Sequence, residues 1–182
     1  MNTTETTIHL AAIVQQGKDY TDALLHRFIG QLKSQGSIVR GLVPDLQNSP
    51  DTCYTHAIRD LETDIAYPIK QNLGKESTAC CLDTGALLAA GAVLRRAMQG
   101  HADLVIVNRF GILETEGKGF NDEIIKLVGC GYPVLTVVSA SYLQAWREFT
   151  GGIAQELPPD LDSLMHWFKQ VRVTSPDGVS ID

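Results

Sequence analysis

The chain has 182 residues, a formal charge of -6 and an apolar fraction of 44%. This length suits one compact domain, so we expect residues 1–182 to fold as a single unit. An acidic chain lacks the basic surface on which nonspecific nucleic-acid binding depends, and its apolar runs are too short to span a bilayer. The first residues also lack the pattern of a secretory signal, so we expect a cytoplasmic protein without nucleic-acid binding or membrane insertion.

The first part of the chain predicts a strand, a helix and a second strand. Mainly apolar runs predict strands over residues 8–14 and 37–43. Between them, apolar residues recur at helical spacing, Asp19 or Thr21 is placed to cap the helix, and Gly36 is placed to end it. This arrangement is a βαβ unit, which is expected to have a right-handed crossover.

Residues 45–74 are less regular than the segments around them. We expect two short strands, over 55–61 and 65–71, joined as a small β-hairpin insertion. Pro68 cannot donate a backbone hydrogen bond, which confines its strand to the edge of a sheet. A further short strand is expected over 79–82.

The second half of the chain alternates helices and strands. Asp83 or Thr84 caps a helix that continues through Met98, and the β-branched run 104–107 predicts a strand buried on both faces. Further expected elements are a helix over 120–129 with Ile124, Ile125 and Val128 facing inward, a strand over 134–138, helices over 142–149 and 161–171, and a frayed polar tail over 174–182. The alternation predicts an α/β three-layer sandwich with a mostly parallel sheet.

A polar, glycine-rich stretch follows the expected strand 104–107. It carries Asn108, Arg109, Glu114 and Glu116. Ligands of open α/β sheets bind just past the carboxyl ends of the strands, so these side chains stand where chemistry is expected. The alternative is that Arg109 and the glutamates pair with one another around a surface loop.

The turn after the first expected strand partly matches a phosphate-binding P-loop, G-x-x-x-x-G-K-[ST]. Gly17 and Lys18 match, but Ala12 replaces the first glycine and Asp19 replaces the hydroxyl residue, with Thr21 two positions out of register. Asp19 would place negative charge where a phosphate sits. The alternative is that Gly17 makes a tight turn, Lys18 is solvated and Asp19 caps the helix.

Cysteine and histidine placement gives no metal or redox motif. Cys53, Cys80, Cys81 and Cys130 lack C-x-x-C spacing, so free thiols are expected, and the role of the adjacent pair stays open. The five histidines show no ligand spacing.

Several segments together resemble a known family. They are AAIVQQGKDYTDALLHRF, CCLDTGALLAAGAVLRRAM, ADLVIVNRFGILETEGKGF, GYPVLTVV and AWREFTGG, followed by a tryptophan-bearing helix. The combination is similar to the bacterial domain-of-unknown-function family 2478. The resemblance covers nearly the whole chain and implies a P-loop NTPase-like fold and a link to molybdate-transport genes.

The resemblance also shows a departure from the wider P-loop class. There, a strand ends in an acidic pair that helps to hold Mg²⁺, followed by a glycine and a glutamate. Asn108 and Arg109 stand at the positions of the pair, and Gly111 and Glu114 match the later residues. This implies an anion site that uses Arg109 and Lys18 without a metal. The cofactor is left open, with Mg²⁺ expected only alongside a nucleotide.

Two functional hypotheses use this same site. One is a nucleoside triphosphatase in which Lys18 holds phosphate, Arg109 stabilises developing charge, and Glu114 or Glu116 orients water. The other is noncatalytic binding of a nucleotide or of an oxyanion such as molybdate or tungstate. The full set of candidate binding residues is Gln15, Gln16, Gly17, Lys18, Asp19, Thr21, Asp83, Asn108 and Arg109. For Asp83 the alternative is helix capping.

A third hypothesis is an interaction protein whose P-loop has decayed. Trp146, Phe149, Trp167 and Phe168 would then supply an apolar contact surface. The alternative is that these aromatics cover the sheet. A homodimer through the face beside Met165 is a further expectation. Of the three, nucleotide or phosphate-type anion binding is favoured, with hydrolysis left open.

Overall fold

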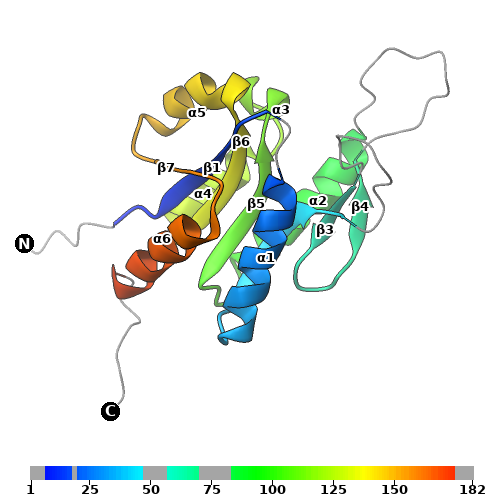
Figure 1. The fold of residues 1–182 in the computed structure, drawn as a ribbon. Helices are drawn as coiled ribbons and strands as arrows, with labels where there is room; N and C mark the ends of the chain where they lie inside the picture. The colour runs from blue at the N-terminus through cyan, green and yellow to red at the C-terminus, as the bar shows by residue number, and fades with distance from the viewer. Residues whose placement is uncertain (1–6, 18–19, 47–56, 70–82, 175–182) are drawn as a thin grey trace, which may run out of the picture.

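A computed structural model describes residues 7–17, 20–46, 57–69 and 83–174 (Figure 1). The strands are β1 (Leu10–Gln15), β2 (Val39–Pro44), β3 (Ala57–Asp60), β4 (Ala66–Pro68), β5 (Leu104–Phe110), β6 (Val134–Ser139) and β7 (Gln155–Leu157). The helices are α1 (Thr21–Ser34), α2 (Thr84–Ala97), α3 (Ile112–Thr115), α4 (Asn121–Gly129), α5 (Leu143–Thr150) and α6 (Leu161–Thr174), with a 3-10 turn, η1 (Ala140–Tyr142).

The seven described strands form one sheet in the order β4-β3-β2-β5-β6-β1-β7. The five strands from β2 to β7 in this order pair in parallel. β3 and β4 add an antiparallel hairpin at one edge, with Pro68 on the outermost strand. The mostly parallel sheet, the hairpin insertion and the edge position of Pro68 are therefore confirmed.

Helices cover both faces of the sheet, which confirms the three-layer sandwich. One face packs on α1 and α6, which lie in front of the sheet in Figure 1, through residues such as Phe28 and Trp167. The other face packs on α2, α4 and α5 through residues such as Leu94, Ile124 and Trp146. Strands buried on both faces read as continuous apolar runs because alternate side chains enter both cores.

The C-terminal aromatics belong to these two cores. Trp146 is 0% exposed, Trp167 is 3% exposed and Phe168 is 2% exposed. Phe168 meets Phe28 edge to face at 6.4 Å, which joins α6 to α1. These three aromatics therefore cover the sheet, and the interpretation that they form an exposed contact surface is wrong.

Some boundaries and orientations differ from the sequence-based expectations. β5 continues beyond Val107 to Phe110, and neither α3 nor β7 was anticipated. Ile125 is 59% exposed and so does not face inward. Tyr20 occupies the N-cap position of α1 without a side-chain cap, and Thr21 is instead the first helical residue. The expected strand 79–82, the tail beyond Thr174, and the residues Lys18, Asp19, Cys53, Cys80 and Cys81 lie outside the described residues.

One glycine permits the central strands to pair. Gly41 of β2 lies in register with Ile106 of β5 and has φ +110. A Cβ at position 41 would lie 2.0 Å from the Ile106 carbonyl oxygen. Both the dihedral angle and the contact exclude other side chains, so this glycine fixes how β2 meets the strand that carries Arg109.

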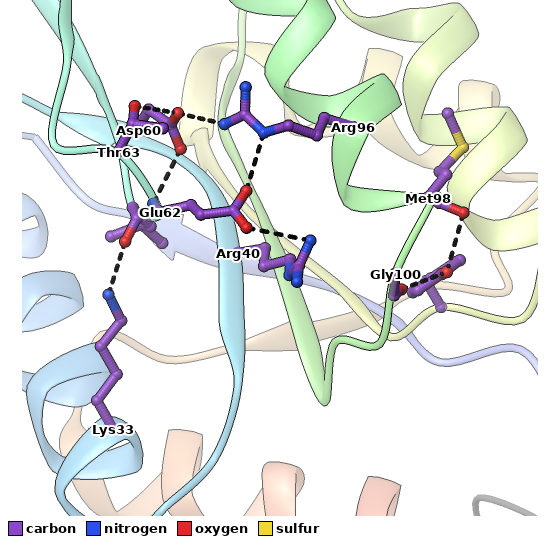
Figure 2. Close-up of polar contacts among 10 residues, drawn as sticks. Lys33, Arg40, Asp60, Glu62, Thr63, Arg96, Met98 and Gly100 are labelled. Carbon is purple, nitrogen blue, oxygen red and sulfur yellow. Dashed lines mark hydrogen bonds and ion pairs between the residues drawn. The ribbon is translucent and has the colours of Figure 1, made fainter.

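A polar network holds the hairpin against the end of α2 (Figure 2). Arg96 in the last turn of α2 contacts Asp60 at 2.5 Å and Glu62 at 2.9 Å. Glu62 also contacts Arg40 of β2 at 3.3 Å. Because α2 ends just before β5 begins, this network lies near the amino ends of the parallel strands, away from the edge described next.

Candidate functional site

The candidate residues that the structure brings together gather at the carboxyl edge of the parallel strands. β1 ends at Gln15, β5 ends at Phe110, and β6 lies between these two strands. Val14 and Phe110 both lie in register with Val138 of β6. The turn after β1 and the NRFG segment therefore flank the same strand end.

An irregularity in β5 sets the direction of the two polar residues at its end. Val107 pairs with Thr136 and Phe110 pairs with Val138, so three steps along β5 match two along β6. The extra residue is a β-bulge in the stretch that contains Asn108 and Arg109. Bulges next to sites redirect side chains, and this one accompanies the projection of Arg109 toward α1.

The Arg109 guanidinium joins three segments of the chain. Nη1 donates to Oε1 of Gln15 at the end of β1. Nη2 donates to Oδ1 of Asp22 in the first turn of α1 at 2.9 Å. The Arg109 and Asp22 side chains are 34% and 25% exposed, so solvent reaches the pair. The result is a solvent-accessible cation beside the turn that resembles a P-loop.

Asn108 places a buried side-chain acceptor at the same strand end. Within the described part of the chain, its Oδ1 is buried and receives no hydrogen bond. Buried acceptors are nearly always satisfied by protein or water, so a donor is expected here. No described cluster of three or more His, Cys, Asp or Glu side chains is placed to hold a metal. The neutral Asn108 oxygen beside a guanidinium is a poor ligand for Mg²⁺, which prefers carboxylates.

Glu114 organises the loop that follows β5. One carboxylate oxygen accepts the Gly111 amide at 2.9 Å and the other accepts the Phe120 amide at 3.0 Å. A Cβ at Gly119, where φ is +63, would lie 2.0 Å from Oε1 of Glu114. Burial raises the pKa of Glu114, although the hydrogen bonds from the Phe120 and Gly111 amides partly oppose that rise. In this structure both oxygens of Glu114 are engaged with backbone amides.

The other candidates occupy different environments. Glu116 is exposed and pairs with Lys118 at 3.0 Å. Asp83 caps α2, because its Oδ1 accepts the Ala86 amide at 2.9 Å. Thr21 is 1% exposed at the start of α1. The structure therefore joins Arg109 to Gln15 and does not bring Glu116 to that pair through any described contact.

The turn itself is described as far as its glycine. Gln16 and Gly17 are exposed, and Gly17 has φ +62, which favours glycine. Asp22 was not among the sequence-derived candidates. An acidic residue in the first turn of a helix is common enough to carry no functional signal by itself. Only its contact with Arg109 identifies it as part of the site.

The sheet order and the helices on both faces define an α/β protein whose fold is like that of a solved nucleoside triphosphatase. A solved structure described as a human cancer-related nucleoside triphosphatase has a TM-score of 0.58 at 13% identity and covers 93% of this chain and 100% of that one. At this identity the likeness is one of fold.

The family is shown by a match over most of the chain. The chain belongs to the family described as a protein of unknown function, DUF2478, whose profile matches residues 10–167. A relative named molybdenum import ATP-binding protein ModC 2, from Bradyrhizobium diazoefficiens, is 33% identical over 162 residues. That alignment covers 88% of this chain but spans only 18% of the relative.

Among the described residues, no helix combines the length and the hydropathy needed to cross a membrane.

Proposed function

We propose that this protein binds a nucleotide or another phosphate-type anion at the carboxyl edge of its sheet, with Arg109 as the principal cation. The observation that carries the proposal is the Arg109 guanidinium, which is accessible to solvent and anchored beside the turn after β1 by Gln15 and Asp22. A guanidinium offers paired N–H donors that match the spacing of two phosphate oxygens. Lys18, next to Gly17 in the sequence, would add a second cation.

The environment of Tyr20 favours a nucleotide over a bare oxyanion. Tyr20 precedes α1 directly and is 90% exposed. Exposed aromatic rings stack on bases of any sequence, whereas an oxyanion offers no face on which to stack. The 33% identical relative, of which the alignment spans 18%, is named an ATP-binding protein, which also supports a nucleotide.

We also propose that the bound nucleotide is hydrolysed, which is a more specific claim than binding. Phosphoryl transfer depends mainly on positioning and on charge stabilisation, both of which Arg109 would supply. Glu114 would act chiefly by ordering the loop, because both of its oxygens already accept backbone amides. Glu116 is exposed and would be the residue able to orient water.

Calorimetric titration tests the proposal. The wild-type protein is titrated with ATP, ADP, tripolyphosphate, molybdate and tungstate, with and without Mg²⁺. We expect ATP to bind, Arg109→Met to abolish that binding, and Arg27→Met, which removes an exposed arginine on the same helix as Asp22, to leave it unchanged. No heat with any ligand, or equal binding by Arg109→Met, would overturn it.

Tyr20→Ala should weaken ATP binding and spare tripolyphosphate.

A second candidate is oxyanion binding linked to molybdenum import. The name of the relative from Bradyrhizobium supports it. In that case molybdate or tungstate would bind through Arg109 and Tyr20→Ala would have no effect.

A cytoplasmic location and a homodimer belong to the same set of proposals. Fractionation of cells and light scattering of the purified protein would test them.

A further inference from the structure

Asp22 accepts a hydrogen bond from the guanidinium that the proposed anion would also use. Arg109 Nη2 donates to Asp22 at 2.9 Å while Nη1 donates to Gln15. Each terminal nitrogen of the guanidinium thus donates one hydrogen bond to a protein oxygen. A carboxylate and a phosphate group present the same pair of negatively charged oxygens to a guanidinium, so the two are direct competitors.

The pair is built so that it can exchange partners. Both side chains are partly exposed, at 34% and 25%, so water can reach either group once they separate. Ion pairs of this kind add little net stability because solvent screens them and because two long side chains must be ordered. The hydrogen bond to Gln15 is independent of Asp22 and also holds the guanidinium at the end of β1.

We propose that Asp22 is a built-in competitor that sets the anion affinity of Arg109. Binding is then an exchange in which a phosphate-type group replaces the Asp22 carboxylate, and the released carboxylate opposes the incoming charge. This inference rests on the proposed anion binding and adds a residue that weakens it. It assigns Asp22 a role opposite to that of Gln15.

The test is a titration with tripolyphosphate in Mg²⁺-free buffer at low salt. Asp22→Asn should tighten binding by about five- to tenfold, since it removes both the competitor and one negative charge. The matched control is Asp122→Asn, which removes the same charge from the first turn of α4, where Asp122 is exposed. The control should change affinity less than twofold. In an Arg109→Met background, Asp22→Asn should give no gain.

The outcomes separate this inference from the proposed function. If the wild-type protein binds through Arg109 but Asp22→Asn binds no more tightly, the competitor role is wrong and anion binding stands. Equal gains from Asp22→Asn and Asp122→Asn would also overturn it, because net charge alone would explain both. If neither the wild-type protein nor Asp22→Asn binds any anion, the proposed function fails as well. Thermal unfolding without ligand confirms that each variant is folded.

Discussion

Arg96 and Arg109 both tie together segments that are distant in sequence, but at opposite ends of the sheet and with differently solvated partners. Arg96 contacts Asp60, whose side chain is 0% exposed (Figure 2). Arg109 contacts Asp22, whose side chain is 25% exposed. The same chemical pair is therefore buried on its acid side in one place and reached by solvent in the other.

The Asp60 carboxylate is saturated by protein donors. Besides Arg96, it accepts the Glu62 amide at 2.9 Å and the Thr63 hydroxyl at 2.5 Å. A buried carboxylate with three donors cannot exchange a partner for an external ligand without losing the contacts that compensate its burial. At the other end of the sheet, the Asp22 side chain is 25% exposed, so solvent reaches its contact with Arg109.

The largest expected effect is on the free energy of unfolding, and it distinguishes Arg96 from Arg109. Arg96→Met leaves the buried Asp60 carboxylate without its cation and should lower the free energy of unfolding by about 3 kcal/mol. Anion binding should persist, because the network is remote from Gln15. Urea unfolding together with calorimetry measures both quantities. An Arg96→Met variant that has normal stability but no longer binds anions would contradict this distinction between the two arginines.

The second prediction compares Glu114 with Glu116 in the loop between β5 and α4. Glu114→Ala leaves the half-buried Gly111 amide and the buried Phe120 amide without their acceptor, which should cost about 2 kcal/mol in total. Glu116→Ala removes an exposed pair with Lys118 and should change stability little. Chemical denaturation of both variants checks the contrast, and equal losses would show that Glu114 does not order this loop.

The third prediction concerns acid. Burial alone raises the pKa of Asp60, but hydrogen bonds from Thr63, the Glu62 amide and Arg96 outweigh burial and hold that pKa below its ordinary value. A carboxyl with a lowered pKa contributes stability above its unfolded pKa, and that contribution is lost as pH falls through the folded pKa. Stability should therefore drop below about pH 4.

Asp60→Asn supplies the control for the acid experiment. This variant should be less stable at neutral pH and should show a shallower fall in acid, because it has no carboxyl to protonate. Unfolding measured from pH 3 to pH 7 (roughly the range that spans carboxyl titration) gives both curves. Parallel curves for the two proteins would mean that Asp60 is not the group that titrates.

The smallest expected effect is on the stability of the Arg109→Met variant. Loss of a partly exposed ion pair should cost about 1 kcal/mol or less. The same substitution should abolish anion binding, which makes the binding loss attributable to the site and not to unfolding. Differential scanning calorimetry without ligand measures it, and a loss as large as that of Arg96→Met would mean that Arg109 is an anchor too.

Much of the fold was accessible from sequence because burial imposes patterns. The apolar runs near Ile13, Ile106 and Val137 are continuous because helices cover both faces of those strands. The cap at Asp83 and the edge strand at Pro68 followed from backbone chemistry that acts locally. The short β7 was missed because three residues without an apolar pattern give no periodicity to detect.

The sequence predicted less of the candidate site, because contacts between distant segments leave no periodic pattern in the chain. Gln15 and Arg109 were selected because each comes just after an apolar run in the sequence. The bulge at Asn108 and Arg109 leaves no mark in the sequence, since it depends on pairing with β6. The engagement of Glu114 by two amides depends on the path of the loop around it, which spacing alone does not give.

The amino-acid sequence by itself determined the alternation of strands and helices, the hairpin beside the sheet and the likeness to its family, because these depend on local propensity and on the periodicity of burial. Only the tertiary structure decided that Asp22, 87 residues from Arg109, meets its guanidinium. It also decided that Asp60 is buried while Asp22 is not. Contacts of such long range depend on how the layers pack, and no residue carries that information in its own neighbourhood.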